Sequence, residues 1–451
     1  MNPLLEDAAR RACAYLEALP SRGVAPSKAA IDALALLDEP LPAHPRDAHE
    51  VLRRLDEIGS PATSAMGGGR YFGFVIGGAL PVCIASNWLA TAWDQNAGLY
   101  DPTPGVASFE QVALRWLLEM FELPRDAAGA FVTGATQANL CGLAAARHAL
   151  LARLGWDVEA NGLFGAPPIS VVVSAEAHPT LFKSLGVLGL GRDRVTRVDT
   201  DAQGRMRVDR LPALTASTIL CVQAGNVNSG AFDPVQELCE RARPEGAWVH
   251  VDGAFGLWAL ATPSLRALSR GLPLADSWAP DAHKWLTVPY DSGLAFVRDG
   301  ASLRAAMAVS AAYLPAHPTR RSPSDYTPEL SRRARGVDVW AALATLGRDG
   351  VAQMIDRCCR HARRIAGGLE AAGYEILNQV VLNQVLVSFG SDARTQRVIA
   401  GLQRDGTCWC GVTQWRGRTA MRISVSSWAT SDADVDLSLE AMLRIASGCG
   451  N

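Results

Sequence analysis

Amines are scarce in this sequence, which limits where amine chemistry can occur. Only three of the 43 basic residues are lysines, at positions 28, 183 and 284. Lys28 and Lys183 lie in predicted helical segments and are typical of solvated or ion-paired side chains. Lys284 instead follows a predicted buried strand and precedes Trp285 and Leu286. Since open α/β sheets place their sites just beyond strand ends, Lys284 is the candidate for a functional amine.

Two further groups that could take part in catalysis also follow predicted strands. Asp252 ends the strand that precedes the Lys284 strand, and small residues come after it. A structural carboxylate held by backbone N–H groups is the alternative interpretation, but a buried charge favours a charged partner. His250 and Asp252 have the spacing of a metal pair, yet no third ligand stands at a suitable distance in the sequence, so no metal is predicted.

The third group is Thr133–Asn139, where a strand ends in a small turn that opens a helix. Such a turn offers backbone N–H groups and a favourable dipole to a phosphate. A phosphate seat, a buried carboxylate and an amine together are typical of pyridoxal 5'-phosphate (PLP) catalysis. There the lysine forms a Schiff base with the aldehyde, and the carboxylate keeps the pyridine nitrogen protonated so that the ring accepts electrons. No P-loop and no GxGxxG between a strand and a helix occurs, which disfavours hydride transfer from a dinucleotide.

Two motifs carry a resemblance to a known family. The sequences HVDGAFG at 250–256 and DAHKWLTVPYDSG at 281–293 resemble the PLP-dependent decarboxylases that include aromatic-L-amino-acid and glutamate decarboxylases. The resemblance runs in order from about Arg70 to Val435. It implies an α/β protein with the aspartate-aminotransferase-like PLP fold (fold type I), which has a mainly parallel central sheet and a small C-terminal α+β domain.

The resemblance also implies roles for individual residues. Lys284 matches the Schiff-base lysine, and Asp252 matches the partner of the pyridine nitrogen. His178 matches the histidine that stacks on the cofactor ring, although it could simply cap a helix. Tyr313 matches a loop tyrosine that protonates the substrate carbon after carbon dioxide leaves, although it could be an ordinary aromatic anchor. The expected cofactor contacts are Gly134, Ala135, Thr136, His178, Asn226, Asp252, Ala254, His283 and Lys284.

Two segments of the sequence bear on these contacts and on the substrate. Asn226 stands where the family has a cofactor-contacting threonine, so we expect the asparagine to substitute for it. Phe72 and Phe74 match a segment that lines substrate pockets in the family, and a role in the core is the alternative.

The elements that position these residues alternate between strands and helices. We expect an N-terminal helical segment (1–75), a large PLP-binding domain (76–335) and a small C-terminal domain (336–451). Asp233 is the expected N-cap of one helix, and the uncharged stretch Gly73–Trp93 is interpreted as a buried loop followed by a core helix. The predicted strands of the large domain are Ala130–Thr133, Ser170–Ser174, Val195–Val198, Thr218–Gln223, Trp248–Val251, Asp276–Ala279 and Leu294–Val297.

Composition excludes some classes of protein. The 451 residues carry a formal net charge of -2 and are 49% hydrophobic, as expected of a globular chain with neither nucleic acid nor an anionic membrane as its main partner. The ten cysteines are scattered and form no CxxC motif. Together with a charged N-terminus that lacks a signal-peptide pattern, they favour reduced thiols and a cytoplasmic protein.

The sequence therefore predicts decarboxylation of an L-amino acid to an amine and carbon dioxide. An aromatic or apolar substrate is favoured because no second basic cluster is evident. By the resemblance, the chain forms a homodimer with its active site at the interface and with N-terminal helices that wrap the partner. A decarboxylative aldehyde synthase is the nearest alternative, disfavoured because Tyr313 and His178 are both retained. An aminotransferase or another carbon–carbon lyase comes next, and the intact Lys/Asp/His set argues against a non-catalytic scaffold.

Overall fold

The chain divides into two compact units. The computed structural model describes residues 2–309 and 320–450. One unit consists of Gly77–Arg360 and Asn378–Gln384, and contains Lys284; we call it the lysine unit. The other, which we call the terminal unit, contains the chain up to Ile76, His361–Leu377 and the chain from Val385 onward. The division at 75/76 and 335/336 remains a prediction.

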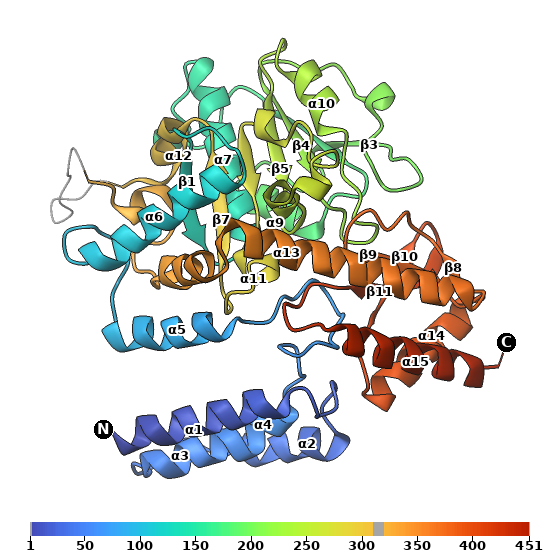
Figure 1. Ribbon diagram of the computed structural model, residues 1–451. Coiled ribbons are helices and arrows are strands. Elements are labelled where there is room, and N and C mark those ends of the chain that lie inside the picture. Colours follow the sequence, from blue (N-terminus) through green and yellow to red (C-terminus); the bar gives the residue numbers. More distant parts are fainter. Residues whose placement is uncertain (1, 310–319, 451) are drawn as a thin grey trace. The chain divides into compact units, whose positions relative to one another are not determined.

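The lysine unit is built on a seven-stranded sheet in the order β1-β7-β6-β5-β4-β2-β3 (Figure 1). Within the described residues, β7 runs in the opposite direction to the other six strands. The mainly parallel sheet and all seven predicted strands are thereby confirmed, with ends that differ by at most two residues. The strands are β1 (Ala128–Val132), β2 (Ser170–Ser174), β3 (Val195–Val198), β4 (Thr218–Gln223), β5 (Trp248–Asp252), β6 (Ser277–Ala279) and β7 (Gly293–Val297).

Helices lie between the strands, as the alternating pattern predicts. They are α5 (Pro81–Trp93), α6 (Pro104–Met120), α7 (Ala135–Arg153), α8 (Val158–Asn161), α9 (Pro179–Val187), α10 (Val235–Ala242), α11 (Ala282–Trp285) and α12 (Gly300–Met307). The long α13 (Arg335–Ala371) has residues in both units and is interrupted at Gly347, whose φ is 60°. Short 3-10 turns are η3 (Val208–Arg210), η4 (Gly256–Ala261), η5 (Pro263–Leu265), η6 (Leu272–Leu274) and η7 (Pro323–Tyr326).

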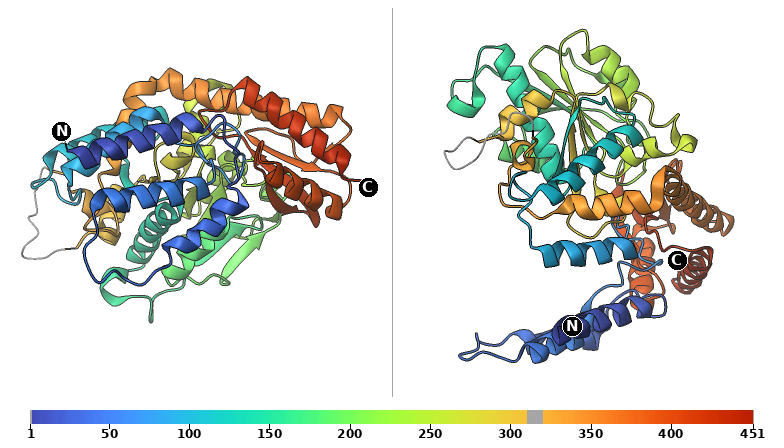
Figure 2. Two further views of the ribbon diagram at one scale, coloured as in Figure 1. Left: turned by 90° about the horizontal axis from the view of Figure 1, so that it is seen from below. Right: turned by 60° about the vertical axis from the view of Figure 1, so that its left-hand side comes forward.

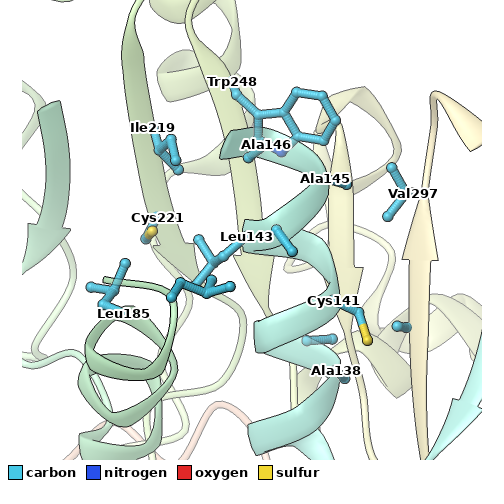
Figure 3. Packing of buried hydrophobic residues seen from close by; sticks show 14 of the residues in the cluster. Ala138, Cys141, Leu143, Ala145, Ala146, Leu185, Ile219, Cys221, Trp248 and Val297 are labelled. Atoms are coloured by element: carbon cyan, nitrogen blue, oxygen red, sulfur yellow. The ribbon is translucent and has the colours of Figure 1, made fainter. Parts of the chain in front are cut away.

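A hydrophobic core of the lysine unit lies between α7 and the sheet (Figure 3). The helix contributes mostly small side chains, and Leu143 is its large residue at the centre, with no exposed surface. Ile219 and Cys221 of β4 and Leu185 of α9 surround it. Because alanines let a helix approach a sheet closely, the first turn of α7 is held firmly over the strand ends.

Two local expectations were wrong. Asp233 does not cap α10, whose N-cap is Pro234; its carboxylate accepts hydrogen bonds from the backbone N–H groups of Met206 and Gln223 at 2.7 Å each. In addition, α5 is not a core helix, because only Cys83 and Ser86 of its residues are buried. The uncharged sequence suggested burial, but α5 exposes much of its apolar surface within this chain.

The terminal unit combines N-terminal helices with a four-stranded sheet in the order β10-β11-β9-β8. Helices α1 and α3 run side by side (Figures 1 and 2). The sheet and its two long helices make the predicted α+β arrangement. The elements are α1 (Pro3–Ala18), α2 (Lys28–Ala33), η1 (Leu34–Leu37), α3 (Ala48–Arg54), η2 (Leu55–Gly59), α4 (Ser60–Ala62), β8 (Glu375–Ile376), β9 (Gln384–Ser388), α14 (Asp392–Asp405), β10 (Gly411–Trp415), β11 (Arg418–Ser424) and α15 (Asp432–Gly448).

None of the ten cysteines forms a disulfide, and eight of them are buried. Among the described helices, none is both long enough and apolar enough to cross a bilayer. The described residues also contain no group of three or more His, Cys, Asp or Glu side chains that could hold a metal ion.

Substitution of Leu143 tests the position of the core. We expect Leu143→Ala to lower the free energy of unfolding by about 2–5 kcal/mol, because it removes a fully buried side chain and leaves a cavity. Chemical denaturation of both proteins measures this difference. Leu154→Ala is the matched control, since Leu154 is 48% exposed, and an equal loss in the two variants would contradict the assigned core.

Candidate active site

Three strand ends converge at one edge of the sheet. Strands β1, β5 and β6 run in the same direction, since β1 and β6 are both antiparallel to β7 and β5 is parallel to β6. Their carboxyl ends therefore meet at one edge, which is where ligands bind in open α/β sheets. This brings the turn after β1, the carboxylate at the end of β5 and the lysine beyond β6 into one region.

The amine of Lys284 is held by a neighbouring carboxylate. Lys284 lies in the single turn α11, with 21% of its side chain exposed. Its Nζ lies 2.9 Å from Oδ2 of Asp281, which is itself only 3% exposed. The other oxygen of Asp281 accepts a hydrogen bond from the backbone N–H of Ala135 at 2.6 Å. Asp281 therefore connects the lysine turn to the start of α7.

Glycines allow the backbone to close around the lysine turn. A Cβ on Gly77 would lie 1.8 Å from the carbonyl oxygen of Lys284, so no larger residue fits there. A Cβ on Gly293 would lie 2.4 Å from the Cα of Gly134. These two contacts fix the lysine turn and the turn after β1 by direct backbone packing.

The first turn of α7 provides a seat for an anion. Its N-cap is Gly134, which has no side chain to cap the helix. In the described part of the chain, the backbone N–H groups of Thr136 and Gln137 have no hydrogen-bond acceptor. Backbone N–H groups that lack acceptors at the start of a 19-residue helix favour the binding of a phosphate.

Asp252 lies at the end of β5 and is 6% exposed. Its Oδ2 accepts a hydrogen bond from Nδ2 of Asn139 at 3.3 Å, and the backbone N–H of Ala254 is a second donor. Burial raises the pKa of Asp252, and the nearby charges of His178 and Lys284 partly oppose that rise. The carboxylate has neutral donors but no direct ion pair within the described residues, so a cation is needed to complete its environment.

His178 is both the N-cap of α9 and a neighbour of the site. Its Nδ1 accepts a hydrogen bond from the backbone N–H of Thr180 at 3.3 Å and lies 2.7 Å from the Thr180 hydroxyl oxygen. When the ring is neutral, the acceptor role of Nδ1 places its single proton on Nε2. The capping interpretation and the cofactor interpretation of this histidine are therefore compatible, since the cap fixes the ring orientation.

His283 lies next to Lys284 and is held on several sides. Its Nδ1 accepts a hydrogen bond from the backbone N–H of Ser292 at 3.2 Å, and its Nε2 lies 3.6 Å from Asp281. The ring of Tyr290 packs against it, with the centroids 4.4 Å apart. Burial lowers the pKa of His283, so the imidazole is neutral and Nε2 is available as a donor.

These residues fit PLP. The uncapped start of α7 suits the phosphate, and the Lys284 amine suits the aldehyde. The buried Asp252, without a cationic partner at hydrogen-bonding distance in the described chain, suits a protonated pyridine nitrogen. Gly134 keeps the phosphate seat open, since a Cβ there would lie 3.3 Å from the His283 ring.

The other predicted site residues lie in separate segments of the chain. The side chain of Asn226 closes its own turn, because its Oδ1 accepts from the N–H groups of Asn228 and Ser229. Its nitrogen donates to Gln223, so these contacts do not favour a cofactor role. In the terminal unit, Phe72 is 1% exposed and Phe74 is 60% exposed. Tyr313 lies outside the described residues, and its role stays a prediction.

Sequence reasoning missed Asp281 and Asn139 as parts of the site. Asp281 stands inside the DAHKW motif, three residues before the lysine, and this spacing on a helical turn was a usable signal. Asn139 carries no such signal, because a polar residue in the first turns of a helix is ordinary. Only the packing of α7 against β5 places its amide beside Asp252.

Comparison with known proteins gives concordant results. The family model described as the pyridoxal-dependent decarboxylase conserved domain matches residues 32–390. The aromatic-L-amino-acid decarboxylase of Bacillus atrophaeus is 28% identical over 362 residues, which are 77% of this chain and 73% of that protein. The L-2,4-diaminobutyrate decarboxylase of Rhizobium meliloti (strain 1021) is 28% identical over 365 residues, which are 76% and 70% of the two chains.

Solved structures agree on the fold. The crystal structure of Oryza sativa TDC with PLP and tryptamine superposes with a TM-score of 0.91 at 22% identity, and the match covers 100% of this chain and 98% of that one. The expected aspartate-aminotransferase-like PLP fold (fold type I) is confirmed, and PLP is confirmed as the cofactor.

The contact between Gly77 and Lys284 yields a test of the site geometry. We expect Gly77→Ala to displace the lysine turn, to weaken PLP binding at least about tenfold, and to lower the free energy of unfolding by about 1–3 kcal/mol. Titration of the cofactor-free protein with PLP, followed by absorbance, measures the affinity. Gly367→Ala is the control, because no atom lies within 4 Å of its added Cβ. Unchanged PLP affinity in Gly77→Ala would contradict the described packing.

Proposed function

Because the chain belongs to the pyridoxal-dependent decarboxylase family, we propose that it converts an aromatic or apolar L-amino acid to the amine and carbon dioxide. The chain is a PLP-dependent carboxy-lyase that acts on an amino acid, which is the activity common to the family and to the named relatives. The names of the relatives cover aromatic, diamino and acidic substrates. The substrate class is therefore argued from this chain's own residues.

Each site residue has a defined part in the proposed reaction. PLP, when bound, supplies a ring that accepts the electrons of a bond broken at the substrate Cα. Lys284 holds the cofactor aldehyde until substrate arrives, and Asp252 holds the proton at the pyridine nitrogen. The first turn of α7 would bind the phosphate through backbone N–H groups, and His178 would stack on the ring, as the family resemblance implies. Tyr313 is the proposed proton donor to the substrate carbon.

The proposed substrate preference rests on the family resemblance, which assigns Phe72 and Phe74 to the substrate pocket, and on the aromatic contacts of Phe74 within the terminal unit. Trp409 stacks on Tyr71 with centroids 5.1 Å apart, and on Phe74 with centroids 6.2 Å apart. Phe74 is held at φ 51° and leaves more than half of its ring exposed. A rigid ring presented in this way suits an aromatic or apolar side chain, because stacking favours flat apolar groups. Phe72, buried beside it, is proposed to support this surface.

The charges of the lysine unit also disfavour an acidic side chain. Arg332 is fully buried and pairs with Glu110 at 2.8 Å. Arg335 pairs with Asp291 at 2.9 Å. Since both buried guanidinium groups already have carboxylate partners, their charge is largely balanced and attracts a second carboxylate of aspartate or glutamate less strongly.

A substrate panel tests the proposal. PLP-loaded protein is incubated with L-amino acids while carbon dioxide, amine and aldehyde are measured. We expect aromatic or apolar substrates to give carbon dioxide and amine in equal amounts, with aspartate and glutamate at least about tenfold slower. Phe74→Ala should raise KM for the aromatic substrate more than it changes kcat.

The controls separate the alternatives. Lys284→Ala should abolish turnover without unfolding the protein. Comparable turnover of aspartate or glutamate would contradict the substrate class. Aldehyde with hydrogen peroxide would assign the chain to the decarboxylative aldehyde synthases, and a cofactor spectral change without carbon dioxide would indicate transamination or another lyase.

We also propose that the chain is a homodimer with its active site at the interface. In the terminal unit, α1, α2 and α3 have no buried residue, and Leu5, Leu36 and Leu55 are each at least 64% exposed. In the lysine unit, α5 exposes Trp88 and Leu89. Apolar surface of this extent is typical of a protein interface.

Sedimentation velocity tests the assembly. We expect a species of twice the 47.9-kDa chain mass. A charge within an apolar interface is strongly disfavoured, so Leu89→Glu should convert the dimer to monomers. Leu154→Glu places the same charge at an exposed leucine of α7's C-cap and is the control. A monomeric wild-type protein would contradict the proposal.

We propose a cytoplasmic location for the enzyme. Its support is chemical, because none of the ten cysteines forms a disulfide and eight are buried, as expected in a reducing compartment. Burial raises the pKa of several of these thiols, for example that of Cys83 to about 12, so they remain protonated and unreactive.

A further inference from the structure

A chain of buried polar side chains leads from Asp252 into the interior of the lysine unit. Trp248, His250 and Asp252 alternate along β5 and therefore share one face of the sheet. Ser277 of β6 lies directly beside His250 in the strand register. The side-chain amide of Asn139, on α7, forms hydrogen bonds with both His250 and Asp252. His250, Ser277 and Asn139 have no exposed surface, so their hydrogen bonds must be made with one another.

The direction of each hydrogen bond follows from the ionised carboxylate of Asp252, which can only accept, and from the indole at the other end, which can only donate. The indole N–H of Trp248 can only donate, and it donates to Oγ of Ser277 at 2.9 Å. The Ser277 hydroxyl then donates to Nδ1 of His250, 2.7 Å away. With Nδ1 as an acceptor, a neutral ring carries its proton on Nε2.

The chain continues from the ring to the carboxylate. Nε2 of His250 donates to Oδ1 of Asn139 at 2.8 Å. The amide of Asn139 is then fixed with its oxygen toward the imidazole and its nitrogen toward Asp252, where Nδ2 donates to Oδ2 at 3.3 Å. Burial lowers the pKa of His250 to about 3, so the ring stays neutral throughout the physiological range. A Cβ on Gly142 would lie 2.8 Å from two atoms of this ring, so the glycine makes room for it.

We propose that Ser277, His250 and Asn139 form a positioning relay that turns a hydrogen-bond donor toward Asp252 and so keeps this carboxylate ionised and correctly aimed at the cofactor. This inference rests on the proposed pairing of Asp252 with the pyridine nitrogen. Ser277 does not contact the carboxylate, but its hydroxyl can donate to Nδ1 and so satisfies the Nε2–H tautomer of His250. Without that hydroxyl the buried Nδ1 loses its donor. The Nε2–H tautomer is then held less firmly, and the Asn139 amide can turn its oxygen toward Asp252, which repels the ionised form.

The protonation of the bound cofactor tests the relay directly. The cofactor-free protein is loaded with PLP that carries nitrogen-15 in the pyridine ring, and the nitrogen chemical shift is measured by NMR. We expect the pyridinium position for the wild-type protein. In Ser277→Ala the signal should move toward the unprotonated position, and PLP affinity should fall about tenfold, because a buried partner is left unsatisfied.

Ser269→Ala is the matched control. Ser269 is 2% exposed in the same unit, and its hydroxyl bonds only to local carbonyl groups. It should leave both the nitrogen signal and the affinity unchanged. If Ser277→Ala does not fold, His250→Phe is the second variant. It breaks the same chain of hydrogen bonds while Asn139 and Asp252 remain, and it is expected to move the nitrogen signal in the same direction.

The outcomes distinguish this inference from the proposed substrate. A folded Ser277→Ala or His250→Phe protein that keeps the pyridinium signal and wild-type affinity overturns the relay. An unprotonated nitrogen in the wild-type protein overturns both the relay and the assignment of Asp252. The expected shifts, obtained with a protein that does not turn over aromatic amino acids, support the relay and refute only the substrate class.

Discussion

A carboxylate buried at the end of a strand is costly unless its surroundings compensate for the lost water. Asp252 receives hydrogen bonds from an asparagine amide and from a backbone N–H group, but it has no direct ion pair among the described residues. Its burial raises its pKa, so the ionised form depends on what the neighbouring groups supply. Much of the surrounding architecture can be understood as meeting this one requirement.

The sheet meets the requirement by bringing separate segments to a single edge. The parallel order of β4, β5 and β6 aligns their carboxyl ends, and β1 joins them through the antiparallel β7. Backbone contacts at Gly77 and Gly293 then fix the lysine turn and the phosphate seat. These contacts depend on hard-sphere packing alone, so the site geometry is established before any ligand binds.

Strand positions in the lysine unit were predictable from sequence, because strands buried on both faces are continuously apolar. The lysine, the β5 carboxylate and the turn after β1 were equally predictable from residue type at strand ends. The role of Asp233 could not be predicted from sequence, because a carboxylate that precedes a helix has the pattern of an N-cap. Only the fold brings the backbone N–H groups of Met206 and Gln223 to this carboxylate. The exposure of α5 was also hidden, because an apolar helix has the same sequence whether or not the rest of the chain covers it. The sequence marks His250 as one half of a possible metal pair, and its contacts with Ser277 and Asn139 are what connect it to the site.

The two carboxylates of the site have different partners, and the difference bears on cofactor selection. Asp281 pairs with the Lys284 amine at 2.9 Å, so the positive charge of Lys284 is already balanced by this carboxylate. Asp252 receives neutral donors instead of an arginine or a lysine at bonding distance. A fixed cation beside it would satisfy the charge within the protein and remove the attraction for a protonated pyridine ring. Neutral donors orient the carboxylate but leave its charge in place, so the site gains electrostatic stabilisation only when a cationic ring binds.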